Sequence, residues 1–164
     1  LLNHQAALDY VLNKPDYFRE LTVQKILEIH RFLTKGLGIP NKIRAGRVGI
    51  TGTNYKPLAK ANQIQKALQD LCDLINSKRN VLEKAFIALL LIAYIQPFED
   101  GNKRTARIIC NALLLPNKYC PISFRTVEPE DYRYATLLFY EQNSIPSFKK
   151  IFMEQLEFST ANYF

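Results

Sequence analysis

The stretch AFIALLLIAYIQPFEDGNKRTAR, Ala85 to Arg107, joins a nearly continuous apolar run to a dense polar segment. A helix that is apolar almost all round is typical of a buried position, so we expect Asn80–Ile95 to be a central helix. Pro97 cannot donate to a helical ladder, and the helix should end or bend near it. The polar segment has the residues of a turn, and we expect Asp100 or Asn102 to cap a second helix over Asn102–Leu115.

Apolar residues recur at helical spacing along most of the remaining chain, which predicts an all-α fold. The other expected helices are Asn3–Asn13, Leu21–Leu37, Pro57–Ser77, Glu128–Gln142 and Pro146–Phe158. The segment Ala45–Pro57 differs, because Val48 and Ile50 alternate among three glycines; we interpret it as a small β-hairpin or extended flap. The length favours one domain over residues 1–164, and because the chain opens at Leu1 rather than Met we expect further residues upstream.

Composition limits the functional classes. Hydrophobic residues make up 48% of the chain, charged residues 23%, and the net charge is +7; this is ordinary for a soluble protein and favours phosphate-bearing partners. We do not expect nucleic-acid binding, because the basic residues are scattered, concentrate near the nucleotide-type site described below, and form no platform with aromatic residues. The longest apolar run is too short for a membrane span. Three cysteines without a CxxC pair argue against zinc or disulfides and favour a reducing, cytoplasmic location; they are Cys72, Cys110 and Cys120.

The start of the second helix carries an unusual charge pattern. Lys103, Arg104 and Arg107 occupy its first two turns, where each cation opposes the helix dipole by about 0.3–1 kcal/mol. Free N–H groups at that end would bind an anion, and Gly101 permits close approach of the backbone to a ligand. Asp100 could hold a divalent cation beside the phosphates. These residues indicate a magnesium-nucleotide site; the plainer alternative is a capped helix with surface arginines.

The polar segment resembles the Fic motif, H-P-F-x-[DE]-G-N-G-R-x-x-R, of enzymes that usually move AMP from ATP onto a protein hydroxyl. The matching residues are Pro97, Phe98, Asp100, Gly101, Asn102, Arg104 and Arg107. Other segments are similar to the family as well: NHQAALDYV to its opening helix, Ile29-His30-Arg31 to its IHR segment, and RAGRVGITGTNYKP to its target-binding flap. The resemblance covers essentially the whole chain and implies a Fic-fold helical bundle.

The resemblance also implies a role for each matching residue. Asp100 would bind Mg²⁺, and Gly101, Asn102 and Lys103 would form the anion hole for ATP. Arg104 would hold the phosphates, and Arg107 would meet the terminal phosphate or an inhibitory glutamate. Phe98 would anchor the loop in the core. The flap residues that would bind an extended target segment are Gly49, Ile50, Thr51 and Gly52. Tyr132 and Tyr140 either lie near the adenine or, as we favour, simply cover the half-buried face of a helix.

One departure from the motif affects catalysis. The family's leading His, which is its general base, is Gln96 here. A glutamine amide can orient a hydroxyl but cannot take its proton, and general-base catalysis is worth about 10²–10⁴-fold. Neither other histidine replaces it by position, since His4 and His30 lie in distant predicted helices, and we expect His30 to be a packing residue. The ATP site could therefore be intact while transfer is slow or absent.

A second departure is Lys103, where the common motif has glycine. The Doc branch, which transfers a phosphoryl group, also has Lys there, but it has Ala where this chain has Gly101. We therefore expect AMP transfer to a protein hydroxyl, with two alternatives: a catalytically silent nucleotide- or protein-binding module, and a Doc-like phosphotransferase. The family's inhibitory helix, [ST]-x-x-x-E-[GN], has no match in the expected place, and we expect it upstream of Leu1 or on a partner.

Overall fold

The computed structural model describes residues 2–163, and over this range the chain is all-α, as the sequence predicts. The helices begin and end close to the expected residues, and the largest extension is at the C-terminal helix. They are α1 (Leu2–Asn13), α2 (Val23–Thr34), α3 (Ala61–Ser77), α4 (Val81–Ile95), α5 (Asn102–Leu114), α6 (Pro129–Gln142) and α7 (Pro146–Tyr163), with 3₁₀ turns at Pro15–Phe18 and Leu115–Asn117.

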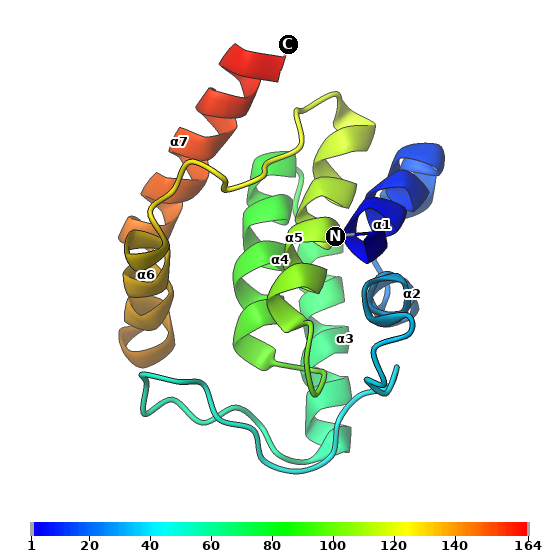
Figure 1. Cartoon of the computed structure of the whole chain (residues 1–164), viewed down its shortest axis with the longest axis vertical. Helices are drawn as coiled ribbons and strands as arrows, with labels where there is room; N and C mark the ends of the chain where they lie inside the picture. The colour runs from blue at the N-terminus through cyan, green and yellow to red at the C-terminus, as the bar shows by residue number, and fades with distance from the viewer. Residues whose placement is uncertain (1, 164) are drawn as a thin grey trace.

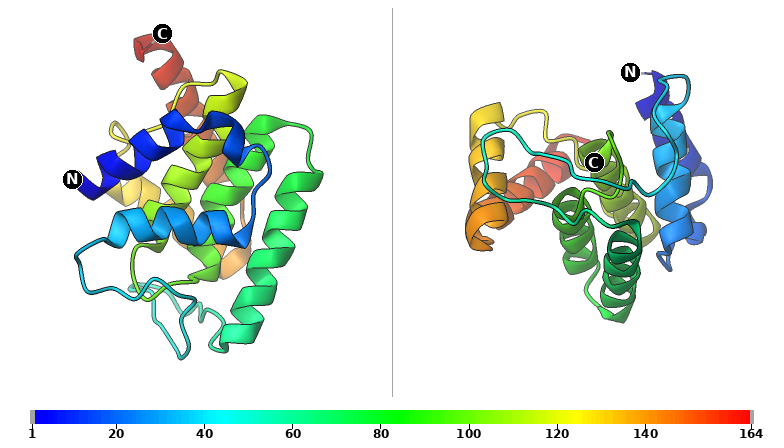
Figure 2. Two further views of the ribbon diagram at one scale, coloured as in Figure 1. Left: turned by 90° about the vertical axis from the view of Figure 1, so that its right-hand side faces the viewer. Right: turned by 90° about the horizontal axis from the view of Figure 1, so that it is seen from below.

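Helices α4 and α5 lie at the centre of the bundle, and the other helices surround them (Figure 1). α1 and α2 cover one side, α6 and α7 the other, and α3 packs along α4 (Figures 1 and 2). The continuous apolar run of α4 is explained by this position, because neighbours surround the helix on several sides. Among the described residues, no helix combines the length and hydrophobicity that a membrane crossing would require.

The segment between α2 and α3 forms an extended flap rather than a paired hairpin. None of the described residues is in a β-strand, and one backbone hydrogen bond, from Gly46 N to Ala59 O at 2.9 Å, crosses the base of the flap. The flap passes beneath the bundle and reaches the foot of α6 (Figure 2). Its apolar residues Val48 and Ile50 are half buried, so contact with the bundle, not cross-strand pairing, holds the extended shape.

Candidate functional site

The loop 96–101 turns the chain sharply from α4 into α5. Gln96 ends α4 in the left-handed conformation, with φ 52°, and its N–H donates to Ile92 O. Both polar atoms of its side chain are hydrogen-bonded: Nε2 donates to Ala93 O at 2.6 Å, and Oε1 accepts from Asn102 Nδ2 at 3.0 Å. Helix α4 therefore ends at Ile95, two residues before Pro97 and near it as predicted, and these bonds hold the side chain of Gln96 in place.

Asn102 holds the loop together and does not cap the helix, so the capping prediction is wrong. Its Oδ1 accepts from Phe98 N at 2.9 Å, and its Nδ2 donates to both Phe98 O and Gln96 Oε1. Gly101 is the N-cap and makes no side-chain capping bond, while Asp100 Oδ1 accepts from Gly101 N. Both N–H groups of the Asn102 side chain and its oxygen are directed at the loop, and its oxygen accepts no bond from the amides of the helix.

His30 on α2 supports the loop from below, and its predicted packing role is confirmed. It is fully buried, its ring stacks on that of Phe98 with centroids 3.7 Å apart, and its Nε2 lies 3.0 Å from Asp100 O. A carbonyl oxygen only accepts, so Nε2 carries the proton of this bond. Gly101 sits above this ring with φ 85°, and the nearest ring atom would be 3.5 Å from a Cβ. The glycine is therefore required by its φ angle and not by crowding.

Arg44 fixes the root of the flap to the end of α4, a contact that the sequence analysis missed. Its side chain is 1% exposed, and its guanidinium donates to Gln96 O at 2.5 Å, Gly46 O at 2.7 Å and Ile95 O at 3.4 Å. Burial lowers the pKa of Arg44. Carbonyls at a helix C-terminus lack intrahelical partners and carry the negative end of the dipole, which explains why a cation is stable there. One residue thus aligns the flap with the motif loop.

The first turn of α5 has unpaired backbone donors. The first intrahelical bond runs from Thr105 N to Gly101 O, and within residues 2–163 the amides of Asn102, Lys103 and Arg104 have no acceptor. Gly101 N is different, because the carboxylate of Asp100 already accepts from it. Three adjacent free N–H groups at the positive end of a 13-residue helix suit an anion.

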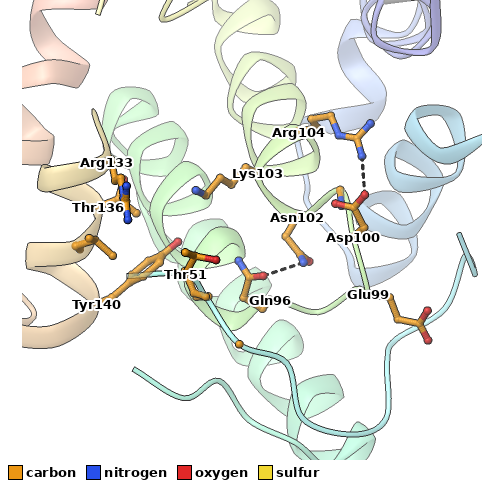
Figure 3. A pocket seen from close by; sticks show the side chains of 14 residues that line it. Thr51, Gln96, Glu99, Asp100, Asn102, Lys103, Arg104, Arg133, Thr136 and Tyr140 are labelled. Carbon is orange, nitrogen blue, oxygen red and sulfur yellow. Dashed lines mark hydrogen bonds and ion pairs between the residues drawn. The ribbon is translucent and has the colours of Figure 1, made fainter. Parts of the chain in front are cut away.

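These amides open into a cleft of about 510 Å³, large enough for a nucleotide-sized ligand. The flap, the loop, the start of α5 and one face of α6 line it (Figure 3). The cleft brings together most of the residues expected at the site: Gly49, Ile50, Thr51, Gln96, Asp100, Gly101, Asn102, Lys103 and Arg104. Gly52 and Arg107 are not among the lining residues. A side chain on Gly52 would collide with the guanidinium of Arg133.

Positive charge dominates the wall of the cleft between α5 and α6. Lys103 extends from α5 toward Arg133 on α6 (Figure 3). Partial burial lowers the pKa of Lys103, and the neighbouring Arg107 and Arg133 charges lower it further. Arg107 itself lies over the rings of Tyr132 and Phe124, 5.0 and 5.6 Å from their centroids, and its Nε is buried without a hydrogen-bond partner. A polyanion in the cleft would relieve this repulsion.

The donor set suits a magnesium ion only when a ligand supplies further oxygens. No cluster of three or more His, Cys, Asp or Glu occurs in the described part of the chain. Asp100 offers one carboxylate at the cleft, two-thirds exposed, whose Oδ2 meets Arg104 at 3.3 Å. Mg²⁺ commonly uses one or two carboxylates plus substrate phosphates, and these residues fit that arrangement.

Helix α6 supplies site residues that the sequence analysis did not identify. Arg133, Thr136 and Leu137 line the cleft beside Tyr140, and no motif marks them, because only the fold brings α6 opposite α5. The two tyrosines differ. Tyr140 lines the cleft and its buried hydroxyl has no partner, whereas Tyr132 lies outside the cleft beneath Arg107. Glu99, to which no role was assigned, also lines the cleft.

Comparison with known proteins agrees with this geometry. The sequence profile described as Fic/DOC family matches residues 20–114. "Protein adenylyltransferase Fic" of Nematostella vectensis is 32% identical over 119 residues, which cover 68% of this chain and 27% of that protein. "Protein adenylyltransferase fic-1" of Caenorhabditis elegans is 26% identical over 151 residues, covering 88% of this chain. The chain spans 29% of the length of that relative.

Solved structures show the same fold. Fic-1 from C. elegans superposes with a TM-score of 0.78 at 22% identity, over 96% of this chain and 49% of that one. BepC from Bartonella tribocorum, with bound AMPPNP, gives 0.69 at 17% identity, over 93% and 85%. IbpAFic2 in complex with adenylylated Cdc42 gives 0.70 at 20% identity, over 94% and 53%. The profile match over more than half of the chain, the motif over residues 96–107 and this shared fold together show that the chain belongs to the Fic/DOC family.

Proposed function

We propose that the cleft binds ATP with Mg²⁺ and is built for transfer of AMP to a hydroxyl of a protein target. The observation that carries the proposal is the set of three unpaired amides at the start of α5, which open into a cleft with Lys103 and Arg133. The names of the relatives and the AMPPNP bound to BepC support a nucleotide ligand. The adenylylated Cdc42 bound to IbpAFic2 supports a protein target.

Different residues of the cleft would bind the phosphates, bind the metal ion and position the loop. The backbone N–H groups of Asn102, Lys103 and Arg104 donate to phosphate oxygens, and the Lys103 and Arg104 side chains balance the phosphate charge. Asp100 would hold Mg²⁺, which screens the phosphates when bound. The target hydroxyl attacks the α-phosphorus, the bond to the β-phosphate bridging oxygen breaks, and pyrophosphate leaves. The side chain of Asn102 positions the loop through its bonds to Phe98, while its backbone N–H stays available to the phosphates.

Gln96 sets the rate of this reaction. Its amide is bonded to Ala93 O and to Asn102, and it has no basicity near neutral pH. The attacking hydroxyl therefore loses its proton to solvent water and not to a general base, and we expect transfer to be slower by about 10²–10⁴-fold than with histidine. The same observation favours the second candidate, a module that binds nucleotide and target without turnover.

The third candidate, Doc-like phosphoryl transfer, rests on Lys103. It would place the γ-phosphate of ATP, and not the α-phosphate, at the accepting hydroxyl. We further propose that an inhibitory segment, upstream or supplied by a partner, acts through Arg107. In this structure Arg107 stays over its aromatic neighbours with an unpartnered buried Nε, and a carboxylate could satisfy it.

Binding and transfer are tested separately. Calorimetric titration with Mg-ATP should show binding that falls at least tenfold in Asp100→Ala and in Arg104→Ala, but not in the exposed control Arg79→Ala; equal binding by all four proteins refutes the nucleotide site. Incubation with α-³²P-ATP and a cell lysate should label protein only after Gln96→His. Strong labelling by the unaltered chain would refute the role given to Gln96, and labelling from γ-³²P-ATP instead would establish phosphoryl transfer.

A further inference from the structure

The net positive charge of the chain comes from one stretch that lies outside the motif segment, although basic residues occur throughout the sequence. Between Glu28 and Asp70 there are eight lysines and arginines and no aspartate or glutamate. Since the whole chain carries a net charge of +7, the remainder is close to neutral. This stretch comprises the end of α2, the whole flap and the start of α3. The excess charge therefore belongs to the flap side of the molecule.

Most of these cations have no acidic partner. Arg44 is buried, and the other seven are exposed. Among the salt bridges within residues 2–163, only Lys66–Asp70, at 2.8 Å, uses a residue of this stretch. Exposed cations that lack partners at a surface raise the local concentration of anionic ligands.

A second hollow of about 520 Å³ lies within the flap, and it adjoins the nucleotide cleft. Arg47 and Lys56 line it, together with the apolar side chains of Val48 and Tyr55. Gly49 and Ile50 line both this hollow and the nucleotide cleft. A ligand side chain in the hollow would thus contact the same two flap residues as a ligand in the nucleotide cleft.

The flap backbone is available for pairing. Within the described residues, no backbone–backbone hydrogen bond involves residues 47–58, and two of the amides there bond to side chains: Asn54 to Glu141 and Tyr55 to Thr53. An extended segment can pair with such an edge and place alternate side chains in pockets along it.

We propose that Arg47 and Lys56 select target segments that carry Asp or Glu within a few residues of the accepting hydroxyl. The occupant is an extended, acidic segment of a protein, with a carboxylate in the hollow between the two cations. A protein segment fits better than a nucleic acid, because the flap aromatic, Tyr55, stacks on Tyr94 with centroids 4.3 Å apart and donates to Tyr94 O. No flap aromatic is thus free to stack on a base. The identification of this segment as the target rests on the proposed function; the binding itself does not.

The experiment uses synthetic 11-residue peptides with a central threonine. One carries three glutamates within four residues of the threonine, a second has glutamine at the same positions, and an 11-nucleotide oligo-dT is the third probe. Titration calorimetry at 50 and 500 mM NaCl, without nucleotide, compares the unaltered chain with R47Q/K56Q. The matched control is R79Q/K118Q, which removes one exposed Arg from the loop after α3 and one exposed Lys that follows the 3₁₀ turn after α5.

At 50 mM salt the acidic peptide should bind at least tenfold more tightly than the glutamine peptide, and the difference should fall below threefold at 500 mM because salt screens exposed charges. R47Q/K56Q should lose most of the preference, about fivefold per charge, whereas R79Q/K118Q should keep it. Equal binding of both peptides, equal losses in the two variants, or tighter R47/K56-dependent binding of oligo-dT would overturn the proposal. Peptide selectivity without Mg-ATP binding would refute the nucleotide site alone, and the reverse would refute this inference alone.

Discussion

Replacing Arg44 with methionine tests whether one buried cation fixes the flap to the motif loop. Methionine keeps an unbranched side chain of similar length but removes the donors to Gln96 O, Gly46 O and Ile95 O. Two of these bonds are short and the third, at 3.4 Å, is weak. Hydrogen bonds from a charged donor are worth about 1.5–3 kcal/mol each. Part of this loss is offset, because the variant no longer buries a charge and water can enter at the flap to bond the freed carbonyls. We therefore expect R44M to lower the free energy of unfolding by about 3 kcal/mol.

For a domain of this size, 1 kcal/mol changes the melting temperature by about 2–4 °C. Thermal unfolding followed by circular dichroism should therefore show a decrease of about 6–12 °C for R44M. The control is R47M, which removes an exposed arginine of the same flap and should change the melting temperature by less than about 2 °C. Hydrogen exchange should also become faster at Gly46, whose N–H bonds to Ala59 O. A loss for R44M no larger than that for R47M would refute the reasoning.

Three further predictions concern the loop and the cysteines. Asn102→Ala removes the bonds to Phe98 and Gln96 from a residue that is 6% exposed. The free energy of unfolding, measured with urea, should fall by about 2 kcal/mol, and the affinity for Mg-ATP should also fall. Unchanged affinity would contradict the positioning role. Gly101→Ala should lower the free energy of unfolding by about 1–2 kcal/mol, because the residue has a φ of 85°. Gly49→Ala should leave it unchanged, because Gly49 has an ordinary φ and no atom lies within 4 Å of the added Cβ. Equal losses in the two variants would show that φ is not the cause. Burial raises the pKa of Cys72 to about 12, and that of Cys110 is raised as well. Above pH 9 the thiols lose their protons in the unfolded chain but keep them in the folded one, so for each buried thiol the free energy of unfolding should fall by up to about 1.4 kcal/mol per pH unit. C72A should make this decrease with pH less steep. The thiols of the folded protein should also resist Ellman's reagent at pH 8, and rapid reaction would contradict their burial.

The sequence alone determined the helices and the end of α4. Their apolar periodicity is set by local geometry, and Pro97 acts on its immediate neighbours, so both are visible in a short window of residues. The motif likewise placed Asp100, Gly101 and Arg104 in one segment, and these residues do line one cleft. The capping prediction failed because an amide side chain can bond to several partners, and the tertiary structure determines which of them lie within reach. Asn102 bonds to Phe98 and Gln96 and not to the helix amides.

Only the tertiary structure decided what surrounds the motif. Arg44, His30 and Arg133 are distant from it along the chain, and the packing of α2, α6 and the flap brings them to it. No local pattern marks such residues, because their roles depend on which carbonyl, ring or cleft lies opposite them. The concentration of cations between Glu28 and Asp70 was present in the sequence, but only the folded flap places two of those charges around a hollow beside the cleft at the start of α5. Local geometry fixes where helices begin and end, whereas long-range packing fixes which side chains share a site.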